Sequence, residues 1–164
     1  MNSWEFAVAD EKEMETLGQY LAPVFVDTGL VTFSGDLGAG KTTLIRGILR
    51  GLGHQESVKS PTFSLVEPYV IHDQRVYHLD LYRLSDPEEM EFIGGREYFA
   101  GNGLCLVEWP ENGQGFLPPP DISVIIHKVK QGRNVRIELM SDRGAALTNA
   151  LILALEKNTG EQVT

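Results

Sequence analysis

The chain has 164 residues, of which 42% are hydrophobic and 23% charged, and its formal net charge is -9. Its length suits one globular domain, and its acidic balance disfavours direct binding to a long phosphate backbone, so a small nucleotide or a protein is the better partner. The single cysteine excludes an internal disulfide and a cysteine-rich zinc site.

The amino-terminal segment predicts a strand followed by a helix. Residues 4–9 read as a short strand, and Asp10 begins a helix with Glu13 in a capping-box pattern. Pro23 is expected to bend or shorten the last turns of this helix. Its buried stripe comprises Met14, Leu17, Leu21 and Val24.

A glycine-rich loop joins a second strand to a second helix. Residues 30–33 read as an apolar strand, and apolar residues from 44 to 52 recur at helical spacing. Between them, residues 35–42 read GDLGAGKT and fit G-x-x-x-x-G-K-[ST], the phosphate-binding P-loop pattern. Glycines let backbone N–H groups point at phosphate oxygens, Lys41 supplies a positive charge, and the Thr42 hydroxyl can ligate Mg²⁺. The expected nucleotide-binding residues here are Gly35, Asp36, Leu37, Gly38, Ala39, Gly40, Lys41, Thr42 and Thr43.

The middle of the chain predicts a hairpin and an interrupted helix. Strands near residues 64–70 and 75–82 make a hairpin about a turn at 72–74. A helix starts in the proline-containing acidic segment from Ser85 and is interrupted at Gly94. Three apolar residues of this helix are expected to face the core, namely Met90, Phe92 and Ile93.

The rest of the chain completes an α/β pattern. Residues 104–107 form a continuous apolar strand of the kind that is buried on both faces, which gives Cys105 a packing role. Strands at 122–129 and 135–140 form an antiparallel hairpin, and residues 143–156 a final amphipathic helix.

The fold class is therefore α/β. We expect a single P-loop NTPase domain over residues 1–156, with a central mixed sheet flanked by helices, followed by a polar tail at 157–164. The N-terminus lacks a signal-peptide pattern and no stretch reaches about 20 apolar residues, so we expect a soluble, cytoplasmic protein without a membrane partner.

Several polar residues outside the loop are candidates for the same site. Glu108 follows the buried strand, where a P-loop protein needs an acidic group to hold Mg²⁺ or its water, although a strand-capping surface acid fits the position too. Thr62 lies in a proline-containing loop and is placed like a switch-loop threonine that closes on Mg²⁺. Period two places Asp80 on one strand face with His78 and Tyr82, where function and simple solvation are both open.

Two further positions have alternative interpretations. Trp109 either lies close to the nucleotide or packs at the end of the sheet. Arg133 belongs to a basic cluster for which solvated hairpin charge is favoured, with a nucleotide-edge contact or a tRNA-facing patch as alternatives. The cluster comprises Lys128, Lys130, Arg133 and Arg136.

Four sequence blocks together resemble the bacterial TsaE family. They are GDLGAGKT at 35–42, SPTF at 60–63, HLDLYR at 78–83 and VEWPE at 107–111. The resemblance implies an ATPase that uses ATP and Mg²⁺ in threonylcarbamoyladenosine formation on tRNA. It also implies that the protein resets the complex of its partners, the TsaB and TsaD homologues, which would supply most of the tRNA contact.

The resemblance also implies roles for individual residues. It assigns phosphate binding to residues 36–42, metal binding to Thr42 and Glu108, and catalysis or nucleotide sensing to Thr62 and Asp80, with Lys41 acting on the phosphates. His78, Tyr82 and Arg83 are carried over only as members of the motif.

Two other functions remain open from the residues themselves. A small-molecule kinase would need an acceptor pocket and usually an arginine-rich lid, and no segment with clustered arginines stands out. A non-catalytic, nucleotide-operated assembly switch would share every motif described above. The sequence has no [NT]-K-x-D stretch, which argues against a guanine-specific GTPase.

Overall fold

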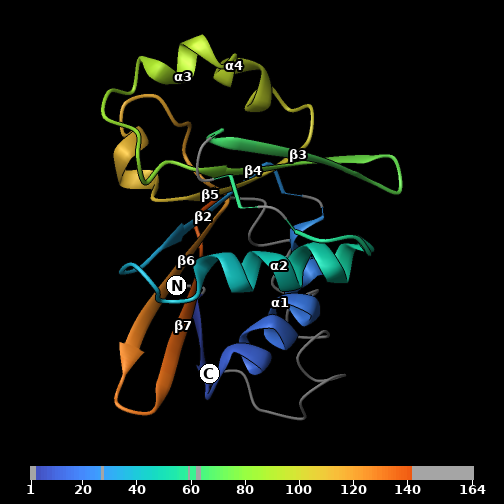
Figure 1. The fold of residues 1–164 in the computed structure, drawn as a ribbon, viewed down its shortest axis with the longest axis vertical. Helices are drawn as coiled ribbons and strands as arrows, with labels where there is room; N and C mark the ends of the chain where they lie inside the picture. The colour runs from blue at the N-terminus through green and yellow to red at the C-terminus, as the bar shows by residue number, and fades with distance from the viewer. Residues whose placement is uncertain (1–2, 27, 59, 62–63, 142–164) are drawn as a thin grey trace.

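A seven-stranded sheet runs through the molecule in the order β1-β7-β6-β2-β5-β4-β3 (Figure 1). The computed structural model describes residues 3–26, 28–58, 60–61 and 64–141. The strands are β1 (Ser3–Val8), β2 (Leu30–Ser34), β3 (Val66–Ile71), β4 (Gln74–Asp80), β5 (Leu104–Glu108), β6 (Ile122–Val129) and β7 (Gly132–Leu139). The helices are α1 (Glu11–Phe25), α2 (Lys41–Leu52), α3 (Glu89–Phe92) and α4 (Gly95–Tyr98), with a 3₁₀ turn η1 at Pro110–Gly113.

The sheet is mixed, as the sequence predicts. The four central strands β6, β2, β5 and β4 are parallel to one another, whereas the two hairpins, β3-β4 and β6-β7, are antiparallel. The β1 strand adds to the far edge beside β7, also antiparallel. Because β2, β4 and β5 are parallel, their carboxyl ends meet at one end of the sheet.

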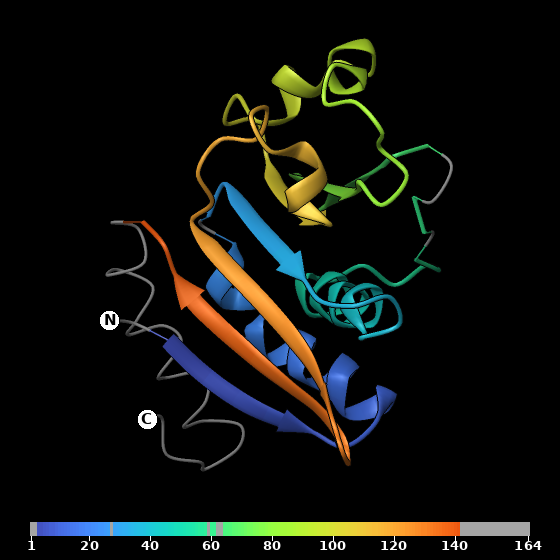
Figure 2. The same ribbon diagram turned by 90° about the vertical axis from the view of Figure 1, so that its left-hand side faces the viewer.

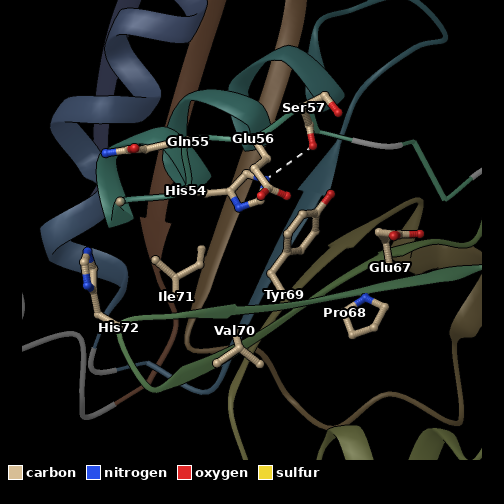
Figure 3. Close-up of a pocket in the computed structure, with 11 residues that line it drawn as sticks. His54, Gln55, Glu56, Ser57, Glu67, Pro68, Tyr69, Val70, Ile71 and His72 are labelled. Carbon is tan, nitrogen blue, oxygen red and sulfur yellow. Dashed lines mark hydrogen bonds between the residues drawn. The ribbon is translucent and has the colours of Figure 1, made fainter.

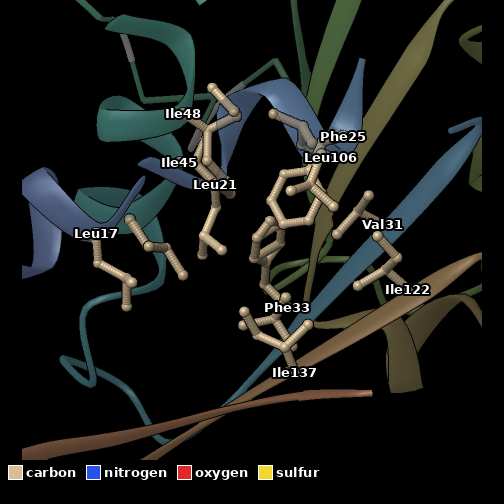
Figure 4. Close-up of a cluster of buried hydrophobic side chains, with 14 of the residues drawn as sticks. Leu17, Leu21, Phe25, Val31, Phe33, Ile45, Ile48, Leu106, Ile122 and Ile137 are labelled. Carbon is tan, nitrogen blue, oxygen red and sulfur yellow. The ribbon is translucent and has the colours of Figure 1, made fainter. Parts of the chain in front are cut away.

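Helices α1 and α2 cover one face of the sheet together (Figure 2). Leu17 and Leu21 of α1 and Ile48 of α2 point toward side chains of the central strands in Figure 4. Burying such apolar side chains is the main favourable term in folding. This layer fixes α2, and therefore the loop before it, over the end of β2.

The two helices approach closely because glycines line their contact. A Cβ on Gly47 would lie 2.1 Å from the Glu15 carbonyl oxygen, and one on Gly18 would lie 2.4 Å from the Leu44 carbonyl oxygen. Such distances leave no room for a side chain. The spacing of apolar residues predicts both helices but contains no signal for this close contact.

Helix α1 begins where the sequence predicts. The Asp10 side chain accepts a hydrogen bond from the Glu13 backbone N–H at 2.9 Å, and the Glu13 carboxylate accepts one from the Ala9 N–H at 2.6 Å. Pro23 does not shorten the helix, which continues to Phe25. Both Val24 and Phe25 are buried, and their packing stabilises the last turn.

A smaller apolar cluster includes residues of β4 and β5 that face away from α1 and α2. Helices α3 and α4 lie at that end of the sheet (Figure 1). Met90 is buried in this cluster, and Ile93 packs against it. The expectation that Phe92 faces the core is wrong, since this side chain is 88% exposed. With only four residues, α3 has too few turns for periodicity to define its buried face.

Other expectations are met in part. Cys105 is buried, and burial raises the pKa of its thiol to about 12. None of the helices in the described part of the chain is long and apolar enough to cross a membrane. The helix expected at residues 143–156 and the tail at 157–164 lie outside the described residues.

Candidate nucleotide site

The P-loop connects the end of β2 to the start of α2 at the carboxyl end of the parallel strands. Gly40 precedes the helix with a φ of +111°, a backbone conformation that would be strained in a residue with a side chain. Gly35 has φ of +154°, and a Cβ on it would lie 2.6 Å from the Ile126 carbonyl oxygen. The backbone of the loop can therefore pass close to β6 and turn into α2, whose N-terminus favours an anion.

Lys41 lies folded back on this loop. Its ammonium donates to the carbonyl oxygens of Gly35 at 2.5 Å and Asp36 at 3.1 Å. The same Nζ lies 4.0 Å from the centre of the Trp109 ring, a cation–π distance. Burial lowers the pKa of Lys41, against the opposing effect of nearby carboxylates.

Trp109 sits directly after β5 with φ of +57°, in the left-handed region. Its ring packs against Tyr82, with the ring centres 4.9 Å apart. The sequence left open whether Trp109 lies near the nucleotide or packs at the end of the sheet. In the structure its ring contacts Lys41 of the loop and packs against the smaller apolar cluster, which confirms the packing and leaves the nucleotide contact a prediction.

Glu108, the last residue of β5, faces the start of α2. Its Oε1 and Oε2 atoms lie 3.1 Å and 2.9 Å from the Thr42 hydroxyl, and Oε2 lies 2.6 Å from Nε2 of His78. Although Glu108 is charged, it is buried. The alternative of a strand-capping surface acid is therefore wrong, because a parallel β2-β5 pair brings Glu108 under the loop.

Asp80 ends β4 beside Glu108, its register partner on β5. Its Oδ1 accepts a hydrogen bond from the Tyr82 backbone N–H at 3.0 Å. Burial raises the pKa of Asp80, and the negative charge of Glu108 raises it further. The period-two placement of His78 and Asp80 on one face is consistent with this arrangement, while Tyr82 lies beyond the end of the strand.

A cavity of about 540 Å³ brings most of these residues together. It is lined by Glu11, Leu37, Gly38, Ala39, Gly40, Lys41, Thr42, Thr43, Ser60, Asp80, Tyr82, Arg83, Glu108 and Trp109. Gly35 and Asp36 form the start of the loop but do not line this cavity. The expected Thr62 lies outside the described residues.

Arg133 lies on the other side of the P-loop. Its Nε donates to the Ala39 carbonyl oxygen at 3.1 Å, and it borders a second cavity of about 330 Å³. That cavity also involves Ala9 and Asp10 at the start of α1, which sequence reasoning missed. The pairing of β1 with β7 brings this segment beside Arg133, and the sequence contains no local signal for that long-range contact.

The oxygen donors suit a magnesium ion. Mg²⁺ is usually held by one or two protein oxygens together with phosphates and water. Thr42 and Glu108 supply a hydroxyl and a carboxylate that already lie within hydrogen-bond distance of each other. The described residues contain no cluster of three or more His, Cys, Asp or Glu side chains that could hold a metal by themselves.

Another cavity, of about 660 Å³, lies away from the P-loop between the end of α2 and the edge strand β3 (Figure 3). The His54 ring packs edge-on against Tyr69 and lies 3.3 Å from the Ser57 carbonyl oxygen. Neither the loop nor the acidic residues Asp80 and Glu108 reach this cavity. This cavity is therefore separate from the residues that the sequence predicts to bind phosphate.

Comparisons with known proteins agree with the motifs. A family model described as "Threonylcarbamoyl adenosine biosynthesis protein TsaE" matches residues 8–136. A Haemophilus influenzae protein named tRNA threonylcarbamoyladenosine biosynthesis protein TsaE is 45% identical over 92% of this chain and 98% of its own. A Bacillus subtilis protein of the same name is 35% identical over 78% of this chain and 80% of its own.

The fold comparison gives the same result. A crystal structure of Bacillus subtilis YdiB superposes with a TM-score of 0.76 at 29% identity, covering 92% of this chain and 94% of that one. The resemblance inferred from four short blocks is thereby confirmed over most of the sequence. The chain belongs to the TsaE family, whose members take part in tRNA threonylcarbamoyladenosine biosynthesis.

Proposed function

We propose that the protein is a magnesium-dependent ATPase that serves tRNA threonylcarbamoyladenosine formation. The observation that carries this proposal is the meeting of Lys41, Thr42 and Glu108 at one end of the sheet. A lysine, a hydroxyl and a carboxylate around a glycine-rich loop are the parts that phosphoryl transfer requires, because catalysis there is mainly positioning and charge stabilisation.

In this proposal the triphosphate lies along the loop and against the N-terminus of α2. Backbone N–H groups of residues 36–42 face its oxygens, and Lys41 exchanges the carbonyl oxygens of Gly35 and Asp36 for the β- and γ-phosphates. Thr42 and Glu108 hold Mg²⁺, which neutralises developing phosphate charge when it is bound.

The two cavities beside the loop suggest how the nucleotide lies. The larger one contains Asp80 and Glu108 and suits the γ-phosphate and the attacking water. The smaller one lies on the opposite side of Gly38 and Gly40, so we assign it to the ribose and base. Arg133 borders that side, in keeping with its expected nucleotide contact.

Asp80 is the proposed group that orients the attacking water. It lies on the strand next to Glu108 and lines the cavity of the loop. Its raised pKa makes it a better proton acceptor than an ordinary surface aspartate. Asp80→Asn should bind ATP as the wild type does yet lose turnover, and turnover at the wild-type rate would contradict this role.

The proposed partners are the TsaB and TsaD homologues, whose complex would be reset by ATP binding and hydrolysis. Membership of a tRNA-modification family supports a link to that machinery. A net charge of -9 favours contact with tRNA mainly through the partners.

The proposal is tested by measuring ATP binding and phosphate release with Mg²⁺ and with EDTA. We expect phosphate release with Mg²⁺ but not with EDTA. Glu108→Ala should lose phosphate release, and Lys41→Ala should lose both ATP binding and phosphate release. Phosphate release that is unchanged by EDTA and by Glu108→Ala would contradict the proposed metal site. Transfer of the γ-phosphate to a metabolite would favour a kinase, and binding without turnover would favour the assembly switch.

A further inference from the structure

His78 lies fully buried beneath the proposed magnesium site, with a side-chain exposure of 0%. Its Nε2 lies 2.6 Å from Oε2 of Glu108, while Nδ1 has no hydrogen-bond partner among the described residues. A buried imidazole with a single polar contact costs desolvation energy that apolar packing would avoid. The contact with Glu108 therefore calls for a functional explanation.

The chemistry of the pair fixes the direction of the hydrogen bond. A carboxylate that is to hold a metal must be deprotonated and can only accept, so in this arrangement Nε2 of His78 donates to Glu108. The distance of 2.6 Å is short for an N–H···O bond, in the direction expected when the carboxylate charge strengthens it.

His78 contacts Glu108 from the neighbouring parallel strand, β4. The Thr42 hydroxyl has one hydrogen to share between the two carboxylate oxygens, at 3.1 Å and 2.9 Å. If the Thr42 oxygen binds a metal, the hydrogen bond from Thr42 to Glu108 depends on that metal as well. The His78 bond engages Oε2 alone and therefore leaves Oε1 available to a metal.

We propose that His78 is a positioning residue that fixes Oε2 of Glu108 and thereby presents Oε1 to Mg²⁺. This inference rests on the proposed function, since it needs a nucleotide and a metal in the site. Residues that orient metal-binding carboxylates typically change metal affinity or activity by about 10–100-fold when they are replaced. His78 itself touches neither nucleotide nor metal in this arrangement.

The first test needs neither metal nor nucleotide. Nitrogen NMR of the ¹⁵N-labelled, metal-free protein reports which ring nitrogen of each histidine carries a proton, and the His78 signals are assigned by their loss in His78→Gln. We expect a proton on Nε2 of His78. A ring protonated on Nδ1 alone cannot donate to Glu108 and would overturn the inference.

The second test measures how ATP binding and hydrolysis depend on Mg²⁺ concentration, with Mn²⁺ binding followed in parallel by electron paramagnetic resonance. His78→Leu should need about 10–100-fold more metal, with ATP binding in EDTA unchanged. His78→Gln, whose amide can donate from a similar position, should recover much of the affinity.

Val76→Ala is the matched control, because Val76 is a fully buried residue on the same face of β4, two positions from His78. This substitution removes apolar packing but no hydrogen bond to Glu108. The Mg²⁺ concentration that the variant needs for ATP hydrolysis should therefore stay near that of the wild type. If His78→Leu does not fold, as chemical denaturation would show, His78→Gln and the NMR result decide.

The failures are distinguishable. A wild-type protein that binds no ATP would contradict the proposed function and with it the role of His78. Normal ATP binding by the wild type, with the same Mg²⁺ dependence in His78→Leu, would overturn the His78 inference alone.

Discussion

At the scale of single residues, the site depends on acidic groups kept close together out of water. Asp80 and Glu108 end adjacent parallel strands, and burial followed by the charge of Glu108 raises the pKa of Asp80 above its ordinary value of 3.8. The folded protein therefore holds the Asp80 proton more tightly than the unfolded chain does. The neighbouring Lys41 is also desolvated, since burial lowers its pKa.

This shift predicts how the stability of the protein changes with pH. Because the folded pKa is raised, the stability that Asp80 contributes is fully present below about pH 4 and is lost as the pH rises through the folded value. Asp80→Asn removes this loss, so the variant should gain stability relative to the wild type as the pH rises. Urea denaturation at a series of pH values measures the difference.

Asp86→Asn is a matched control for that measurement. Asp86 is exposed, and its carboxylate accepts a hydrogen bond from the backbone N–H two residues on, as Asp80 does. The raised pKa of Asp80 would be contradicted if the stability of Asp80→Asn relative to the wild type stayed constant or fell as the pH rises.

At the scale of elements, helix α3 offers a pair of side chains that differ in burial. Met90 is fully buried and Phe92 is 88% exposed, two residues apart. Met90→Ala should cost about 2–5 kcal/mol of unfolding free energy because it leaves a cavity, whereas Phe92→Ala should change it by less than about 0.5 kcal/mol. Chemical denaturation compares the two, and a large loss in Phe92→Ala would mean that α3 is turned the other way.

The contact between α1 and α2 depends on glycine. An alanine at position 47 would place its Cβ 2.1 Å from the Glu15 carbonyl oxygen, so the helices must separate. We expect Gly47→Ala to destabilise the protein by about 1–3 kcal/mol or more, although alanine favours helix formation. Gln19→Ala, at an exposed position of α1, is the control and should be near neutral. A thermal unfolding midpoint that rises in Gly47→Ala would contradict the close contact.

Periodicity and turn residues were sufficient to predict the order and type of the main elements. The strand, loop and helix around the P-loop and both hairpins could be read locally, because each depends on a few adjacent residues. The buried face of α3 could not, since four residues carry no usable period. The contact of His78 with Glu108 spans 30 positions and depends on β4 lying beside β5, which local patterns do not specify.

At the scale of the whole molecule, most of the basic cluster is engaged within the protein. Lys128 donates to the Leu37 carbonyl oxygen at 2.8 Å, and Arg133 donates to that of Ala39 at 3.1 Å. Arg136 pairs with Glu138, whose Oε1 lies 2.7 Å from the arginine Nε. These contacts favour local roles, at the P-loop and within the hairpin, over a surface that tracks tRNA.

The isolated protein should therefore bind tRNA weakly. With a net charge of -9, we expect no specific retardation of tRNA in a gel-shift titration at physiological salt. Lys130→Ala, at an exposed position of the same hairpin, should behave like the wild type. Tight binding by the wild type that falls in Lys130→Ala would instead establish a tRNA-facing patch.

We propose that this chain hydrolyses ATP in the service of a partner complex. The most direct measurement is steady-state phosphate release by the purified protein, alone and with the TsaB and TsaD homologues added, using Lys41→Ala as the blank. We predict that the partners stimulate release by the wild type and leave the blank unchanged. Normal ATP binding with no stimulation by the partners would contradict the claim.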